Sequence, residues 1–121
     1  MAHVDGDPRA LNDGVAETYA FIRDNVLRAG VADQELKELC FRYVADDPEA
    51  TDLERFDGRE RAALEWAHAI VWDSDRADDG LWERLHEHFS EEELVDLGCA
   101  IGFYLGQRNF MKTLGHDEPP A

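Results

Sequence analysis

One long helical pattern, between Ser90 and Gly115, constrains the fold more than any other part of the sequence. Apolar and small side chains recur there every three or four residues, which is the repeat of a helix rather than of a strand. Ser90 and Glu93 form a capping-box pattern at its start. At about 1.5 Å per residue the helix is roughly 35 Å long. We therefore expect it to be the spine of the domain.

Other segments repeat the helical spacing, and none has the alternation of a strand. Asn12 or Asp13 caps the first predicted helix and Gly30 ends it, while Asp57 and Glu60 form a second capping-box pattern. The predicted helices before the last one cover residues 13–29, 33–44, 58–72 and 81–90. We predict an all-α bundle of about five to six helices in one domain, 1–121, with flexible ends at 1–10 and 116–121.

The charge of the chain excludes two classes of partner. Its 28 acidic and 12 basic residues give a formal net charge of -16, which repels phosphate backbones and anionic lipid headgroups. The longest apolar run, Leu97 to Leu105, is about half of the roughly 20 residues that a membrane span needs. The N-terminus has no basic segment followed by an apolar one. We expect a cytoplasmic protein that binds neither nucleic acid nor membrane.

The two cysteines, Cys40 and Cys99, lie far apart and form neither a CxxC pair nor a metal-knuckle spacing. This usage fits a reducing compartment, although a disulfide between the two remains open. Cys40 belongs to an apolar helical stripe with Leu36 and Tyr43, so we predict a thiol buried in the core.

Three stretches carry a resemblance to a known family: "QELKELCFRY", "ERFDGRERAALEWAHAI" and "LWERLHEHFSEEELVDLGCAIGFYLGQRNFMKTLG". Together they cover about two-thirds of the chain, and they resemble the carboxymuconolactone decarboxylase-like and AhpD-like family. The resemblance implies an AhpD-like helical bundle that assembles with itself, as a homotrimer or homohexamer. It also implies lactone decarboxylase or thiol-dependent hydroperoxidase activity.

The sequence departs from the resemblance where the hydroperoxidases carry their active-site motif. Those relatives have Cys-x-x-Cys followed by a histidine after the helix that corresponds to residues 36–44, whereas this chain reads "ADDPEATDLERF". A thiol peroxidase needs an attacking thiolate and a resolving thiol nearby. The standard redox chemistry is therefore not carried over. A hydroperoxidase relative that uses Cys40 or Cys99 in a different way remains an alternative.

A candidate catalytic pair lies on the third predicted helix. Arg61, Glu65, His68 and Trp72 follow at spacings of four, three and four and so share one edge. A carboxylate beside a histidine suits proton abstraction next to a carbonyl, or cofactor-free decarboxylation of a small organic acid or lactone. We take Glu65 and His68 as the candidate catalytic residues of such a lyase, with no cofactor. The alternative is a partly solvated interface edge.

Gly98, Gly102 and Gly106 line one side of the last predicted helix, at a cost of up to about 1 kcal/mol each relative to alanine. Either another helix packs closely there, across a subunit interface included, or a small ligand uses the space. For the second case the predicted pocket-lining residues are Trp72, Gly98, Gly102 and Tyr104. The tryptophans Trp66, Trp72 and Trp82 supply core bulk or line part of an apolar pocket.

No metal site is expected. His86 and His88 are two residues apart and point to different sides of a helix. The acidic segment 73–80 has Asp78 where a calcium loop needs glycine, and Arg84 stands where that loop needs its glutamate. Three functions remain open: a cofactor-free lyase, a hydroperoxidase relative, and a catalytically silent oligomeric binding protein.

Overall fold

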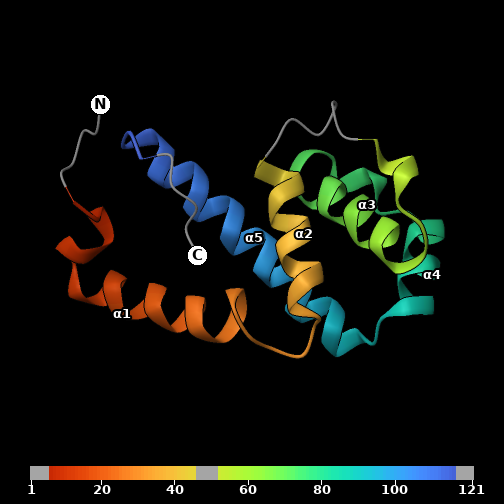
Figure 1. Ribbon diagram of the computed structural model, residues 1–121, viewed down its shortest axis with the longest axis horizontal. Coiled ribbons are helices and arrows are strands. Elements are labelled where there is room, and N and C mark those ends of the chain that lie inside the picture. Colours follow the sequence, from red (N-terminus) through yellow and green to blue (C-terminus); the bar gives the residue numbers. More distant parts are fainter. Residues whose placement is uncertain (1–5, 46–51, 117–121) are drawn as a thin grey trace.

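The computed structural model describes residues 6–45 and 52–116, and every regular element within them is a helix (Figure 1). Short helical turns lie before and between the five α-helices. They are the 3-10 turns η1 (Pro8–Leu11), η4 (Leu53–Arg55) and η5 (Ser74–Arg76), and the π-helical turn η2 (Arg23–Leu27). The α-helices are α1 (Asp13–Ile22), α2 (Gln34–Ala45), α3 (Gly58–Trp72), α4 (Asp79–His88) and α5 (Glu91–Thr113). The all-α prediction is confirmed.

Helix α5 is the spine of the bundle, as its length predicts. It packs against α2, α3 and η2, while α4 packs on α3 (Figure 1). Its inner face buries Leu94, Leu97 and Ile101 completely or nearly so. Farther along, the ring of Tyr104 stacks on Phe41 of α2, with centroids 4.4 Å apart and planes nearly parallel. The core therefore lies where α2 and α3 meet α5.

The two predicted capping boxes have different outcomes. At α5 the box is complete, since the Glu93 backbone N–H donates to Ser90 Oγ at 3.1 Å and the Ser90 N–H donates to Glu93 Oε1 at 3.0 Å. At α3 the helix begins at Gly58 as predicted, but the Asp57 side chain makes no capping bond. Gly58 enters the helix with a left-handed φ of +54°. That backbone geometry differs from the one in which the two bonds of a capping box form.

The first predicted helix is not one regular α-helix. Asn12 caps it as expected, accepting from the Val15 N–H at 3.1 Å, but α1 ends at Ile22 and the chain continues as the π-helical turn η2. The chain then turns at Gly30, whose φ is +119°. The helical segment therefore ends at Leu27, three residues before Gly30, and Gly30 lies in the turn that follows.

Parts of both predicted flexible ends are described in the structure. The guanidinium of Arg9 lies 3.7 Å from the ring centroid of Tyr19, so η1 packs onto α1. His116 is described as well, and its backbone N–H donates to the Met111 carbonyl at 2.9 Å. The rest of the predicted flexible ends, 1–5 and 117–121, and most of the predicted acidic loop, 46–51, lie outside the described residues.

No helix in the described part of the chain is long and apolar enough to cross a bilayer.

Candidate functional site: a groove lined by two tryptophans

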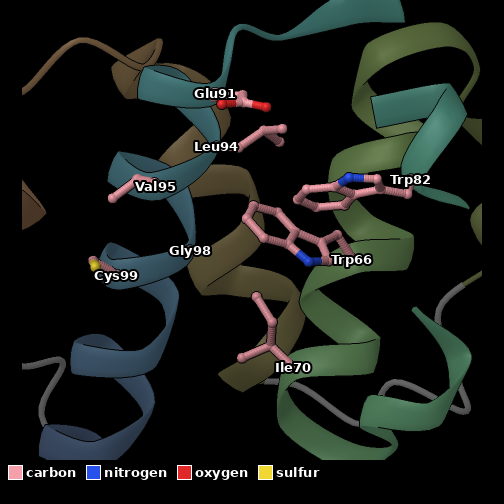
Figure 2. Close-up of a pocket in the computed structure, with 8 residues that line it drawn as sticks. All are labelled: Trp66, Ile70, Trp82, Glu91, Leu94, Val95, Gly98 and Cys99. Carbon is pink, nitrogen blue, oxygen red and sulfur yellow. The ribbon is translucent and has the colours of Figure 1, made fainter. Parts of the chain in front are cut away.

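A groove with a volume of about 560 Å³ lies between α3, α4 and α5. Figure 2 shows how the three helices contribute to it: α3 supplies Trp66 and Ile70, α4 supplies Trp82, and the first two turns of α5 supply the rest. The residues that line it are Trp66, Ile70, Trp82, Glu91, Leu94, Val95, Gly98 and Cys99. Its walls are almost wholly apolar, and its volume falls within the range of small-molecule sites.

Gly98 allows the Trp66 indole to pack against α5 and form one aromatic wall of this groove. The Trp66 indole points from α3 toward α5 (Figure 2), and a Cβ added at Gly98 would lie 2.8 Å from Trp66 Cη2. Such a distance is too short for a carbon–carbon contact. The absence of a side chain at Gly98 therefore permits α3 and α5 of one chain to pack closely. Gly102 and Gly106 differ, because a Cβ at either position would meet nothing within 4 Å.

Trp82 forms the second aromatic wall and is held in place by contacts on α4. Its ring lies edge-to-face with Trp66, with centroids 6.2 Å apart, and 45% of its surface is exposed. The His86 ring lies 4.7 Å from that of Trp82, and the His86 Nδ1 lies 2.9 Å from the Trp82 carbonyl. The Asp78 side chain caps α4 by accepting from the Leu81 N–H. Trp82 is thus a half-exposed aromatic surface on an ordered helix.

Among the described residues that line the groove, Glu91 alone carries a formal charge. Its carboxylate lies at the same end of the groove as Trp82 (Figure 2). The imidazole of His86 lies beside it, with Nε2 at 3.6 Å from Glu91 Oε1. Val95 and Cys99 form the outer rim, where both side chains point away from the tryptophans (Figure 2). The groove is an aromatic and aliphatic surface with one carboxylate at its edge.

Glu65 and His68, the predicted catalytic residues, have different hydrogen-bond partners in the structure. The Glu65 carboxylate accepts from Arg61 Nε at 3.1 Å and from Arg84 Nη2 at 2.7 Å, so two guanidinium groups hold it. No hydrogen bond joins Glu65 to His68 within the described part of the chain. The two residues share a helix edge, but α4 packs on that edge and brings Arg84 to the carboxylate. A second cavity, of about 620 Å³, is lined mainly by polar side chains, among them Glu65 and these two arginines.

His68 instead belongs to an aromatic cluster between α2 and α3. Its Nδ1 lies 2.9 Å from the Tyr43 hydroxyl, and its ring centroid is 5.1 Å from that of Trp72. Trp72 meets the Tyr43 ring edge-on, with centroids 6.0 Å apart. Tyr43 is buried and Trp72 is half-exposed. The contacts within this cluster link α3 to α2, and none of its members lines the groove between Trp66 and Trp82.

Of the four predicted pocket-lining residues, only Gly98 lies in the groove. Trp72 belongs to the cluster with Tyr43, and Tyr104 is buried against Phe41. Gly102 lies one turn beyond the groove on the exposed side of α5. The sequence did not indicate Glu91, Val95 or Cys99. Their spacing could have indicated them, since positions 91, 95 and 99 lie on one face of the last helix together with Gly98.

The cysteines occupy opposite environments. Cys40 is fully buried, and this burial raises the pKa of its thiol to about 12. The prediction of a core thiol at Cys40 is confirmed. Cys99 is exposed, and both residues are free thiols rather than a disulfide. In the segments that the structure describes, no three His, Cys, Asp or Glu side chains gather as a metal site.

The chain was compared with known protein families, with curated proteins and with solved structures, and none of them matches it.

Proposed function

We propose that this protein is a helical binding protein that takes up a small, largely apolar molecule in the tryptophan groove, without redox chemistry. The observation that carries the proposal is the groove itself: two indole walls, an aliphatic floor and about 560 Å³ of space on three ordered helices. We further propose that the fold is a carboxymuconolactone decarboxylase-like variant, on the strength of the sequence resemblance.

The two enzymatic alternatives have less support. A lyase that uses Glu65 as a base needs a carboxylate free to take a proton, whereas this one is held by Arg61 and Arg84. A peroxidase needs a thiolate, whereas Cys40 remains a thiol up to high pH. Cys99 is exposed, but its only possible intramolecular resolving partner is that buried thiol.

Titration with tert-butylbenzene, followed by ligand-observed NMR, tests the proposed function. The neutral probe fills part of an apolar groove, and Trp82→Ala removes one wall of it. We expect saturable binding that this variant weakens at least about fivefold, since indole burial dominates such sites. Trp72→Ala is the matched control, because Trp72 is exposed to 44% and Trp82 to 45%, yet only Trp82 lines the groove. Equal effects of the two substitutions would contradict the assignment.

We also propose that the chain associates with itself. Support comes from the outer face of α5, where Phe103 and Phe110 are 42% and 47% exposed beside the open positions Gly102 and Gly106. Large apolar side chains grouped on one exposed helix face are typical of protein interfaces.

A further inference from the structure

We propose that the tryptophan groove selects an organic cation with an apolar body, such as a substituted ammonium compound, over neutral and anionic molecules of the same shape. This inference rests on the proposed function, because it names the ligand class of the same site.

The first support is the charge at the groove. Glu91 is the one charged residue among its described lining residues, and no lysine or arginine lies among them. A neighbouring cavity shares Glu91, Val95 and Cys99 with the groove and adds Glu92 and Asp96. Lys37 compensates Asp96, whereas Glu92 has no ion pair within the described part of the chain. Two carboxylates, Glu91 and Glu92, thus flank an apolar surface on a chain of net charge -16.

The second support is the arrangement of the aromatic rings. A cation is attracted to the face of an indole within about 6 Å of the ring centroid, and tryptophan is the strongest such partner. Trp66 and Trp82 present two indoles whose planes are inclined by 62°. Because the two rings meet edge-to-face, a compact cation contacts the surface of this indole pair that remains exposed, while its apolar substituents contact Ile70 and Leu94. Aromatic cages recognise quaternary ammonium groups through the same attraction between a cation and a ring.

The third support is the exclusion of anions. An anionic ligand in the groove would lie beside Glu91 with no basic lining residue to compensate it. The imidazole of His86 lies on the α4 side of that carboxylate, with its Nε2 at 3.6 Å from Glu91 Oε1. The negative charge of Glu91 at the groove therefore favours cationic ligands over anionic ones.

The experiment compares three probes of nearly equal shape: phenyltrimethylammonium, tert-butylbenzene and benzenesulfonate. Each is titrated into the full chain at pH 8 and low salt, and binding is followed by ligand-observed NMR. We expect phenyltrimethylammonium to bind about tenfold more tightly than tert-butylbenzene, as a cation–π contact and a nearby carboxylate together provide. We expect no saturable binding of benzenesulfonate. The preference for the cation decreases as salt is added, because Glu91 is exposed.

Glu91→Gln and Glu92→Gln form the matched pair of variants. Both remove one negative charge from the first turn of α5, but only Glu91 lines the groove. We expect Glu91→Gln to reduce the preference for the cation to threefold or less and Glu92→Gln to retain most of it. Trp82→Ala weakens both the cationic and the neutral probe.

The outcomes separate the two proposals. If tert-butylbenzene binds as tightly as the cation, the inference is overturned and the proposed function stands. If neither probe binds, both are overturned. Equal effects of the two glutamine variants mean that the overall charge of the chain attracts the cation, which overturns the assignment of Glu91. Probe binding is also measured while the protein concentration is raised to promote self-association. If the probe is then lost, a second copy of the chain occupies the groove, and the proposed ligand class is overturned.

Discussion

The ammonium of Lys37 lies 2.9 Å from the Asp96 carboxylate, and the lysine side chain is completely buried. The Lys37 ammonium also donates to the carbonyls of Val26 at 2.7 Å and Ala29 at 2.5 Å. Asp96 in turn accepts from the Ala32 N–H at 2.8 Å. One buried cation thus joins η2, the start of α2 and the first half of α5. It is fully paired, as a buried charge must be.

Replacing Lys37 with methionine removes this cation while keeping a similar side-chain volume. We expect a loss of about 3 kcal/mol in the free energy of unfolding, because the substitution leaves two carbonyls and a carboxylate without their donor. Urea denaturation followed by circular dichroism measures it. Lys112→Met is the control, since Lys112 is the other lysine of the chain and is exposed. A loss below about 1 kcal/mol at Lys37 would show that the network contributes little.

The burial of the Lys37 side chain could be inferred from the sequence, but its partner Asp96 could not. Cys40, Phe41 and Val44 follow Lys37 at spacings of three, four and seven, and all of them are buried. A lysine in register with such a stripe points into the core. Asp96 comes 59 residues later, on a helix whose rotation about its axis is set by tertiary packing. Helix positions thus followed from periodicity, and 58–72 agrees with α3 at both ends, whereas contacts between helices required the structure.

The candidate site illustrates the same limit. Glu65 and His68 share an edge of α3 as their spacing predicted, yet neighbouring helices gave them different partners. Arg84 reaches Glu65 from α4, and Tyr43 reaches His68 from α2. The groove was predicted at Gly98 and, as one of two alternatives, at Trp66 and Trp82. The spacing of the glycines indicated an open or tightly packed helix face without indicating which residue fills it.

Alanine substitutions should distinguish the glycines of α5. At Gly98 the added methyl group collides with the Trp66 indole, so we expect Gly98→Ala to displace that ring and to destabilise the fold by about 1–3 kcal/mol. At Gly106 the space is open, and Gly106→Ala should stabilise the helix by about 0.5–1 kcal/mol. Thermal unfolding measures both changes. Stabilisation by both substitutions would contradict the packing of Trp66 on Gly98.

Gly30 provides a stricter case. It has a φ of +119°, and a Cβ there would collide with the carboxylate of Asp96. We expect Gly30→Ala to lower the free energy of unfolding by more than about 1 kcal/mol, since both the backbone strain and the collision oppose it. Gly6→Ala is the control, because Gly6 also has a positive φ but meets nothing within 4 Å. An equal loss at both positions would mean that the carboxylate contributes nothing beyond the backbone strain.

The buried thiol of Cys40 makes stability depend on pH in the alkaline range. Its pKa is about 12 in the folded chain, and a thiol in an unfolded chain has a pKa of about 8.5. The folded state therefore binds more protons between these values, and stability falls as the pH rises. This one group contributes a loss of about 1.4 kcal/mol per pH unit above about pH 9. Below the pKa of the unfolded thiol the contribution is fully present.

Cys40→Ala removes this titration. The variant is less stable than the unsubstituted chain at pH 7, by about 1 kcal/mol for the lost packing, and the difference narrows between pH 9 and pH 10. Urea denaturation at each pH measures the difference. Cys99→Ala is the control, because Cys99 is exposed and its substitution leaves the pH profile unchanged. A constant difference between Cys40→Ala and the unsubstituted chain over this range would contradict the burial of the thiol.

The outer face of α5 gives the last prediction. Val95, Cys99, Phe103 and Phe110 follow one another at spacings of four, four and seven, so they form a single exposed stripe with Gly102 and Gly106 between them. These side chains are exposed in the single chain, and a second copy presents the same stripe.

If this face mediates self-association, a charge placed in its centre must be desolvated when two copies meet. Phe103→Glu should therefore raise the dissociation constant at least about tenfold, which corresponds to 1.4 kcal/mol. Sedimentation equilibrium measures it against the chain mass of 13.8 kDa. Trp72→Glu adds the same charge at an aromatic residue of similar exposure on α3, so an equal effect there would assign the change to net charge rather than to the α5 face.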